Sequence, residues 1–472
     1  MKTRILKVPL TGTNEAALGR WATLPDGTRD LSKWEVPSSS SSFSSEDENP
    51  VLGPLREAAH LLRTTSTPVA FPTETVYGLG ADATRSDAVR GIYRAKGRPS
   101  DNPLIVHISD LDMLRRLLRP SPPSPDHVGG GEEQDDDPIP AIYRPLIARF
   151  WPGPLTILLP LPPGTASRPR PRPRPLTLAP EVSAGQPTFG ARLPASALAR
   201  TLISLAGAPL AAPSANASTR PSPTCARHVR DDLDGRIELV LDGGACAVGV
   251  ESTVVDGLCC PPVVLRPGGV GIEQLRECPG WEGVEKAYGD QASPANGVGK
   301  GPAPRAPGMK YKHYSPRAKV VLFEAGDGAG TGAGAGEGVG EEEMERVVGG
   351  KGGGVKTVAV IRTGRWPVAG GMRHSGVKEI VLGEVVNGQG EVGFVVKEGS
   401  LLGAGGTETV ARLLDVDLGK DIKGVAHGLF AALRELDRLR ADVILVEGVS
   451  DRDDIAAAVM NRLRKAASEI RA

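Results

Sequence analysis

One continuous stretch, residues 68–109, limits the possible folds of this chain more than any other. It reads PVAFPTETVYGLGADATRSDAVRGIYRAKGRPSDNPLIVHIS. An apolar run leads into a turn rich in threonine and glycine, which is followed by an amphipathic segment and a second apolar run. Apolar residues at spacings of three and four, with Ser86 as N-cap and Gly97 after the last of them, predict a helix between two strands. This order of elements indicates an α/β domain.

The end of the predicted helix carries two cations, Lys96 and Arg98. Three hydroxyl side chains, those of Thr73, Thr75 and Ser100, lie near them along the chain, beside backbone that glycine leaves accessible. Cations, hydroxyls and free backbone N–H groups together are suited to bind a polyphosphate. The alternative interpretation is a solvated loop between two elements, without a ligand.

Three segments further along the chain each predict a strand that ends in polar side chains. They are PLAAPSANAS, GVESTVVD and VVLRPGG, at residues 209–218, 249–256 and 263–269. Combined with PTETVYGLG, the pair Lys96-x-Arg98 and the pair Ser214-x-Asn216, they resemble the YrdC-type L-threonylcarbamoyladenylate synthases. The segment APGMKYKHYSP and the glycine-rich α/β half after it resemble the longer, two-domain form of that family.

Composition divides the chain into four parts. Residues 1–48 end in a serine run and an acidic segment, which predicts a disordered tail because such a composition buries little apolar surface. Residues 49–280 and 319–472 each alternate strands and helices, and residues 281–318 between them are rich in glycine and proline. With the resemblance, the expected fold is α/β: a YrdC-type catalytic domain with a twisted mixed sheet and helices, a linker or active-site lid, and a smaller Rossmann-like C-terminal domain.

Low-complexity blocks interrupt the first domain near residues 120–140 and 160–187, and we expect both to be surface loops or insertions. The repeated Arg-Pro dipeptides of the second block either form an extended, solvated spacer, or contact RNA or serve as a nuclear signal. Trp151 lies between the blocks and is expected in the core rather than on a stacking platform. In the second domain, residues 326–340 lack GxGxxG spacing, and the chain has no P-loop motif, so neither kind of nucleotide site is predicted there.

Charge and cysteine content exclude several classes of protein. The chain carries 56 basic and 56 acidic side chains, so no global basic field indicates a nucleic-acid partner, although a local patch is compatible with these counts. Five cysteines without CxxC spacing and seven histidines without HExxH spacing predict a reducing compartment and no structural zinc. No apolar run is long enough to cross a membrane. The N-terminal segment MKTRILKVPL favours the cytoplasm over import into an organelle.

The resemblance implies a reaction of L-threonine, bicarbonate and ATP that yields threonylcarbamoyl-AMP and pyrophosphate. Its product serves a downstream tRNA-modifying enzyme complex, which acts on adenosine beside the anticodon. Because a carboxylated amino acid attacks the α-phosphate of ATP, preorganised cations that hold the developing negative charge should dominate catalysis. Mg²⁺ is expected to accompany ATP, and the sequence identifies no protein ligand for the metal.

The matching motifs assign residues to each substrate by resemblance. Lys96 and Arg98 are the expected catalytic cations. The ATP site is expected to comprise Arg98, Asn102, Thr188, Ser214, Asn216, Ser222, Arg266, Tyr311 and His313. The L-threonine site is expected to comprise Thr75, His107, Arg192 and Ser252, with Arg192 binding the carboxylate. On the residues alone, His107 also fits a structural histidine in a strand, and Ser252 an ordinary strand residue.

The segment PGMKYKHYSP, residues 307–316, has two interpretations. Its glycine and proline content is typical of a passive linker between domains. Two tyrosines, a histidine and two lysines are many contact-making groups for a chain that is only 4% aromatic. The resemblance implies that the segment folds over the nucleotide pocket, so we expect a lid that excludes water from the adenylate.

Two other functions are compatible with these motifs. The first is a double-stranded RNA or ribosome-associated binding module, which would show a salt-dependent affinity without ATP turnover. The second is a hydrogenase-maturation carbamoyltransferase, a family that adds acylphosphatase and zinc-finger segments to a YrdC-like part. Because no CxxC pair occurs in this chain, the second alternative ranks last. The sequence determines neither the oligomeric state nor the ligand of the C-terminal domain.

Overall fold

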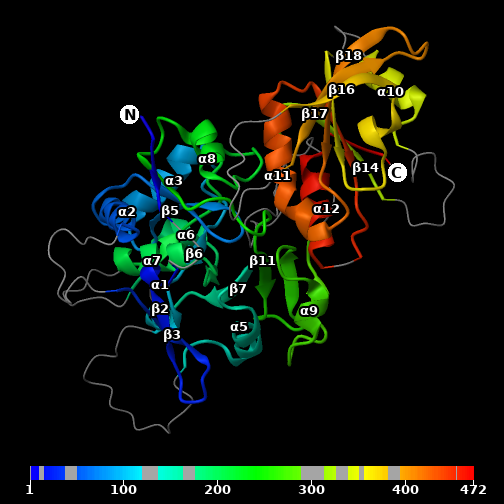
Figure 1. The fold of residues 1–472 in the computed structure, drawn as a ribbon. Helices are drawn as coiled ribbons and strands as arrows, with labels where there is room; N and C mark the ends of the chain where they lie inside the picture. The colour runs from blue at the N-terminus through cyan, green and yellow to red at the C-terminus, as the bar shows by residue number, and fades with distance from the viewer. Residues whose placement is uncertain are drawn as a thin grey trace, which may run out of the picture.

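The computed structural model describes residues 2–9, 15–37, 50–119, 137–162, 176–288, 313–325, 338–349, 356–380, 394–452 and 454–471. Residues 120–136 and 163–175 of the two expected insertions lie outside these residues, and so do Tyr311 and most of the expected lid. The expectation of a surface loop is wrong for residues 176–187, because they include helix α6 Pro180–Ser183 and Val182 is fully buried. Two α/β domains lie side by side, the first coloured blue to green and the second yellow to red (Figure 1).

The first domain is built on a mixed sheet that has eleven strands in the described residues. Their order is β1-β10-β4-β5-β9-β6-β8-β7-β11-β12-β13. Parallel pairs such as β6–β8 occur beside antiparallel pairs such as β4–β5, which confirms the predicted mixed sheet. The strands are β1 Arg4–Lys7, β4 Val69–Pro72, β5 Tyr77–Asp82, β6 Ile105–His107, β7 Leu155–Pro160, β8 Thr188–Arg192, β9 Leu210–Ala211, β10 Leu239–Asp242, β11 Thr253–Asp256, β12 Val263–Arg266 and β13 Glu285–Lys286.

Helices flank the sheet of this domain, and one of them, α3 Ser86–Lys96, has the ends that the sequence predicts to within a residue. They are α2 Leu52–Thr64, α3 Ser86–Lys96, α4 Leu111–Leu118, η1 Ala141–Tyr143, α5 Arg144–Phe150, α6 Pro180–Ser183, α7 Ala197–Ala206, α8 Ala226–Leu233 and α9 Ile272–Arg276. Helix α3 ends at Gly97, whose φ of 61° is left-handed, as predicted. Its N-cap is Arg85 and not Ser86, because Arg85 has extended backbone angles and Ser86 is already helical. Trp151 is 4% exposed, which confirms its place in the core.

The prediction of a disordered tail over residues 1–48 is wrong for residues 2–9 and 15–37. Strand β1 extends the main sheet in parallel with β10, while α1 Glu15–Leu18 and the hairpin of β2 Arg20–Thr23 and β3 Arg29–Glu35 follow it. Trp34 anchors the hairpin: its indole N–H donates to Thr201 of α7 at 3.0 Å, and the guanidinium of Arg200 lies 4.2 Å from its ring centre. The serine run that suggested disorder lies outside the described residues.

The second domain is a smaller α/β unit, as predicted. Its sheet has the order β16-β17-β18-β15-β19-β14-β20, with the five strands from β18 to β20 parallel. Its elements are β14 Lys319–Phe323, α10 Glu341–Val348, β15 Thr357–Arg362, η2 Val368–Gly371, β16 His374–Ile380, β17 Val396–Leu402, β18 Thr409–Asp417, α11 Ile422–Arg438, β19 Val443–Glu447, α12 Asp454–Ala466 and β20 Glu469–Arg471. Helices α11 and α12 lie between this sheet and the first domain (Figure 1).

Glu447, the last residue of β19, occupies an anion-binding loop of the second domain. Its side chain is fully buried. The carboxylate accepts hydrogen bonds from the backbone N–H groups of Thr363, Gly364, Arg365 and Trp366, at distances of 2.7 to 3.1 Å. These donors follow β15 at the carboxyl end of the parallel strands, where Rossmann-type folds bind phosphate.

The two domains share apolar and charged contacts. Val76 and Val250 of the first domain are buried in the same cluster as the apolar residues of α11 and α12. A Cβ atom on Gly249 would lie 2.4 Å from Cα of His427 in α11, so only glycine permits this close approach. Arg434 of α11 pairs with Asp232 of α8 at 2.7 Å. No helix in the described part of the chain is long and apolar enough to cross a membrane.

Candidate active site

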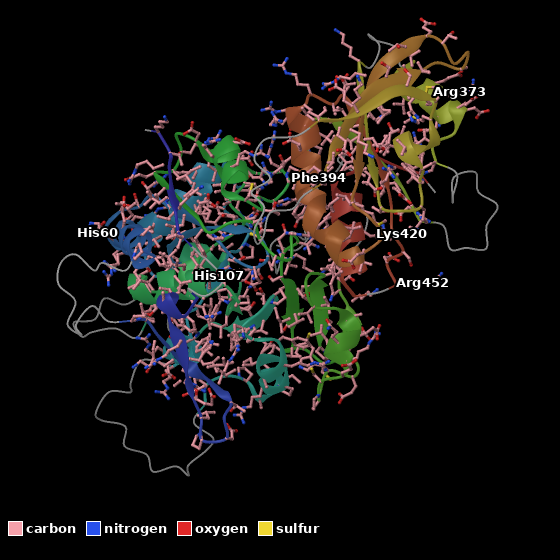
Figure 2. All side chains as sticks on the ribbon, viewed as in Figure 1. His60, His107, Arg373, Phe394, Lys420 and Arg452 are labelled. Carbon is pink, nitrogen blue, oxygen red and sulfur yellow. The ribbon has the colours of Figure 1, made fainter. Side chains whose placement is uncertain are left out.

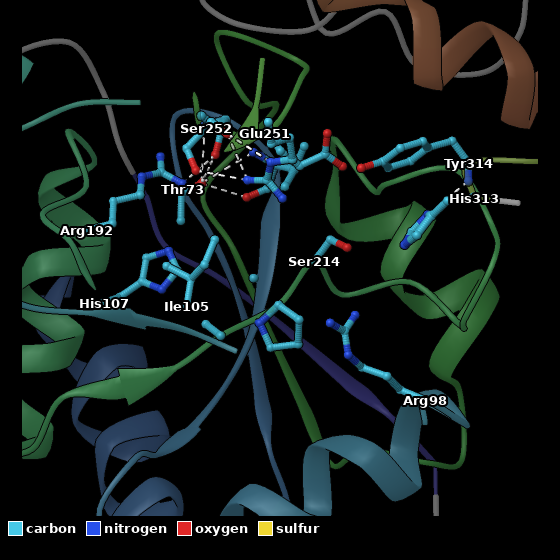
Figure 3. Close-up of a pocket in the computed structure, with 16 residues that line it drawn as sticks. Thr73, Arg98, Ile105, His107, Arg192, Ser214, Glu251, Ser252, His313 and Tyr314 are labelled. Atoms are coloured by element: carbon cyan, nitrogen blue, oxygen red, sulfur yellow. Dashed lines mark hydrogen bonds between the residues drawn. The ribbon is translucent and has the colours of Figure 1, made fainter. Parts of the chain in front are cut away.

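A pocket opens in the first domain where several strands end (Figure 3). Residues after β4, at the ends of β6, β8 and β12, and just before β11 converge on it. The loop after α3, the loop after β9 and the described end of the linker complete its wall. The lining residues are Thr73, Thr75, Val76, Gly78, Arg98, Ile105, His107, Arg192, Ala212, Pro213, Ser214, Glu251, Ser252, Arg266, His313 and Tyr314.

All four residues expected to bind L-threonine line one half of this pocket. The guanidinium of Arg192, which is 4% exposed, donates to Oγ1 of Thr75 at 2.9 Å and to Glu74 at 2.6 Å. The hydroxyl of Ser252 forms a hydrogen bond of 2.8 Å with the hydroxyl of Thr156 in β7, which fixes its position. A cation and the hydroxyl groups of Thr75 and Ser252 thus line one buried pocket.

His107 is buried and electrically neutral. Burial and the charge of Arg192 lower its pKa to about 3. Its Nδ1 atom has no hydrogen-bond partner among the described residues, although a structural histidine usually has one. Figure 2 shows His107 among the packed side chains of the first domain, whereas His60 lies at the outer surface. An unpaired, neutral imidazole that lines a pocket is suited to bind a polar ligand.

Two further arginines, Arg98 and Arg266, line the pocket. Arg98 donates to the carbonyl oxygen of Pro103 at 3.2 Å, and its Nε atom has no partner in the described part of the chain. Arg266 donates to the carbonyl and hydroxyl oxygens of Ser252 at 2.8 and 3.1 Å. Burial lowers the pKa of both arginines to about 10, so both remain cationic at neutral pH. Ser214 lies beside them, and its hydroxyl donates to Asn216.

Lys96 lies behind the pocket wall and does not line the pocket. Its ammonium donates to the carbonyl oxygens of Asn216, at 2.6 Å, and of Ser214. Burial, with the charge of Arg98, lowers the pKa of Lys96 well below its ordinary value. In this structure Lys96 therefore fixes the shape of the loop that carries Ser214.

The remaining residues expected to bind ATP have different positions. Asn102, Asn216 and Ser222 are buried next to lining residues. Thr188 begins β8 and pairs with Pro160, whereas Arg192 ends that strand at the pocket. The rise of a strand places these two ends about 13 Å apart. Thr188 does not line the pocket, so its contact with ATP stays a prediction, and Tyr311 lies outside the described residues.

Thr73, a hydroxyl of the expected polyphosphate site, also lines the pocket, and so do Glu251 and Tyr314, which were not assigned to either substrate. Burial opposes ionisation of Glu251, but the charges of Arg462 and Arg266 and a hydrogen bond from Ser222 lower its pKa to about 2. The signal for Glu251 in the sequence is its place in ESTVVD, directly before two hydroxyl residues.

Tyr314 adopts a left-handed backbone, with a φ of 64°, which a bulky residue holds only when its surroundings fix it. Its ring stacks on Phe430 of α11 with 5.3 Å between the ring centres. Figure 3 shows the tyrosine ring directed toward Glu251, with His313 beside it. The second domain thus helps to place the part of the linker that lines the pocket.

Known proteins resemble this chain over most of its length. Residues 64–268 match the Sua5/YciO/YrdC family model, described as telomere recombination, and residues 270–468 match the threonylcarbamoyl-AMP synthase C-terminal domain. The chain is 42% identical over 427 residues to the threonylcarbamoyl-AMP synthase of Schizosaccharomyces pombe, and the match covers 88% of each chain. It is 37% identical to that of Bacillus subtilis, with 88% of this chain and 92% of the relative covered. The crystal structure of P. abyssi Sua5 complexed with L-threonine matches with a TM-score of 0.61 and 33% identity, covering 88% of this chain and 95% of that one. The chain therefore belongs to the two-domain Sua5/YrdC family of threonylcarbamoyl-AMP synthases.

Proposed function

We propose that this threonylcarbamoyl-AMP synthase joins L-threonine, bicarbonate and ATP in the pocket of its first domain. The observation that carries the proposal is the meeting of two sets of residues in one buried pocket. The set around Arg192 is suited to an amino acid, and the set around Arg98 and Arg266 is suited to phosphates. The L-threonine complex of the related P. abyssi protein supports this assignment.

In the amino-acid half, Arg192 binds the threonine carboxylate. The hydroxyl groups of Thr75 and Ser252 and the unpaired Nδ1 of His107 provide hydrogen bonds for the remaining polar groups of the substrate. Because His107 is neutral, it does not repel the amino group. The amine condenses with bicarbonate to a carbamate, and water is released.

In the nucleotide half, Arg98 and Arg266 stabilise negative charge on the phosphates. A carbamate oxygen attacks the α-phosphorus of ATP, the bond to the bridging oxygen breaks, and pyrophosphate leaves with the electron pair. Two arginines that remain charged in a buried site hold this charge without reorganisation of solvent. No general base is assigned, since positioning and charge stabilisation account for the step.

Mg²⁺ supplies charge neutralisation and orientation of the phosphate oxygens when it is bound with ATP. The described residues contain no cluster of three or more side chains that could hold a metal ion. The nucleotide and water would therefore provide most of its ligands. We also propose that the product is passed to a tRNA-modifying enzyme in the cytoplasm, and the five free cysteines support a reducing compartment.

Pyrophosphate release by the purified full chain should depend jointly on L-threonine and bicarbonate. Valine should be a poor substrate because it leaves the hydroxyl-binding groups unpaired, at a cost of about 1–3 kcal/mol. The measurement compares threonine, serine, valine and no amino acid, each with and without bicarbonate. Equal release under all these conditions would contradict the proposed function. RNA binding without any ATP turnover would favour the alternative of an RNA-binding module.

Substitution of Arg192 by alanine should raise the KM for L-threonine at least about 10-fold and leave the KM for ATP within about 3-fold, because this side chain binds the amino-acid carboxylate. Steady-state kinetics with each substrate varied in turn measure the two constants. The matched control is Arg90→Ala, since Arg90 is an exposed arginine that pairs with Glu181 away from the pocket. An equal rise in both KM values would contradict the assigned role of Arg192.

A further inference from the structure

Arg462 of helix α12 brings a charge from the second domain to the pocket of the first. Its side chain is fully buried. Its Nε atom donates to Oε2 of Glu251 at 2.9 Å, and Nη1 donates to the carbonyl oxygen of Pro267 at 2.8 Å. The guanidinium lies 5.4 Å from the ring centre of Tyr314. Arg462 thus contacts two residues that line the pocket without lining it itself.

The carboxylate of Glu251 requires a positively charged partner such as Arg462. A carboxylate in the pocket wall repels the phosphates of ATP unless its charge is neutralised. Because the side chain of Glu251 is 6% exposed, solvent provides little screening. Its second oxygen, Oε1, accepts a hydrogen bond from Ser222, which orients the carboxylate but adds no charge.

We propose that Arg462 is a positioning residue for the nucleotidyl transfer, which acts through Glu251 by holding its carboxylate and neutralising its charge. This inference rests on the proposed function. It assigns the second domain a part in the reaction, because the neutralising charge of the catalytic pocket comes partly from α12. The contact of Arg462 with Tyr314 links the same arginine to the end of the linker.

Several charged or titratable groups face Glu251 from the elements around it. They are Lys96 of α3, Arg266 of β12, Arg462 of α12, and His313 and Tyr314 of the linker. Burial and the charges of Lys96 and Arg98 lower the pKa of His313 to about 3, so His313 adds no positive charge at neutral pH. Loss of Arg462 leaves Arg266 and Lys96 as the remaining cations, and the carboxyl group of Glu251 then becomes easier to protonate.

The test compares Arg462→Met with Arg434→Met in the full chain. Arg434 is a suitable control because it is also a buried arginine at the domain contact, and its described hydrogen-bond partners do not line the pocket. We expect Arg462→Met to lower kcat about 30-fold or more, and Arg434→Met to change it by less than about 3-fold. L-threonine binding without ATP, measured by calorimetry, should be the same in both. Equal losses of kcat would show that only the domain contact matters and would overturn the proposal.

Two further measurements distinguish an effect of Arg462 on the reaction through Glu251 from a loss of protein stability. In Arg462→Met, kcat/KM for ATP should rise at least about 3-fold as the pH falls from about 7.5 to about 5, relative to wild type, because loss of Arg462 raises the pKa of Glu251 and protonation then removes its unpaired charge. The double variant Glu251→Gln with Arg462→Met should turn over within about 3-fold of Glu251→Gln alone, since Arg462 then has no charge to neutralise.

A large further loss in the double variant, or a pH profile that does not change, would overturn the proposal. If Arg462→Met does not fold, the double variant carries the test, because it contains no unpaired carboxylate. The wild-type protein provides the separate check on the proposed function. If wild type releases no threonine-dependent pyrophosphate, the proposed function fails, whereas an active wild type with unaffected Arg462 variants contradicts only this inference.

Discussion

Replacement of Arg98 by alanine should lower kcat about 100-fold or more, which corresponds to about 2.7 kcal/mol of transition-state stabilisation. Arg98 is a buried cation in the nucleotide half of the pocket, and its Nε atom lacks a partner among the described residues. Without Arg98, the site has one preorganised hydrogen-bond donor fewer for the negative charge that develops on the phosphates. The readout is threonine-dependent pyrophosphate release at saturating ATP.

The fold should remain intact in Arg98→Ala, since this side chain contributes two long hydrogen bonds to backbone carbonyls, at 3.2 and 3.5 Å. Arg90→Ala, in the helix α3 that precedes Arg98, again provides the control, because Arg90 is exposed and pairs only with Glu181 among the described residues. Equal activity of the two variants would show that Arg98 does not stabilise the phosphates. A lower melting temperature of Arg98→Ala alone would indicate a structural role.

Lys96→Met should also lower kcat about 100-fold, but for a different reason. The ammonium of Lys96 donates to the buried carbonyl oxygens of Ser214 and Asn216. Without it, each carbonyl loses a donor at a cost of about 1–3 kcal/mol, which is enough to change the conformation of this loop. Methionine retains most of the side-chain volume, so the effect reports the charge and the hydrogen bonds rather than a cavity.

The variants Lys96→Met and Arg98→Ala should differ in thermal stability. Lys96→Met should lower the melting temperature measurably, whereas Arg98→Ala should not, because the hydrogen bond of Lys96 to Asn216 is short, at 2.6 Å, and those of Arg98 to backbone carbonyls are long, at 3.2 and 3.5 Å. Calorimetric unfolding of both variants beside wild type measures this difference. If Lys96→Met retained wild-type turnover, the conformation of the Ser214–Asn216 loop would not limit the reaction.

The motifs that carry the family resemblance predicted the residues that line the pocket at strand ends. Thr75, His107, Arg192 and Ser252 each lie at or beside the end of a strand, so the correct assignment of strands brings them together. Gly97 marked the end of α3 correctly because a left-handed residue after a helix is nearly a property of glycine.

Other parts of the structure could not be derived from local patterns. The segment before the serine run folds because Trp34 packs against α7, and this contact joins residues 167 positions apart. Thr188 begins the strand that Arg192 ends, and the separation of these two residues follows from the sheet register rather than from the motif. The pair of Arg462 and Glu251 spans 211 positions and two domains, and no periodicity or motif indicates such a contact.

Glu447 limits which ligands the second domain can hold. Four backbone N–H groups that would otherwise receive a phosphate already bind its carboxylate, so the domain supplies its own anion. A nucleotide could enter only by displacing a buried carboxylate and repelling its charge. The second domain therefore retains the topology of a nucleotide-binding fold without a free nucleotide position at this edge, and it can serve as a rigid support for the contact helices α11 and α12.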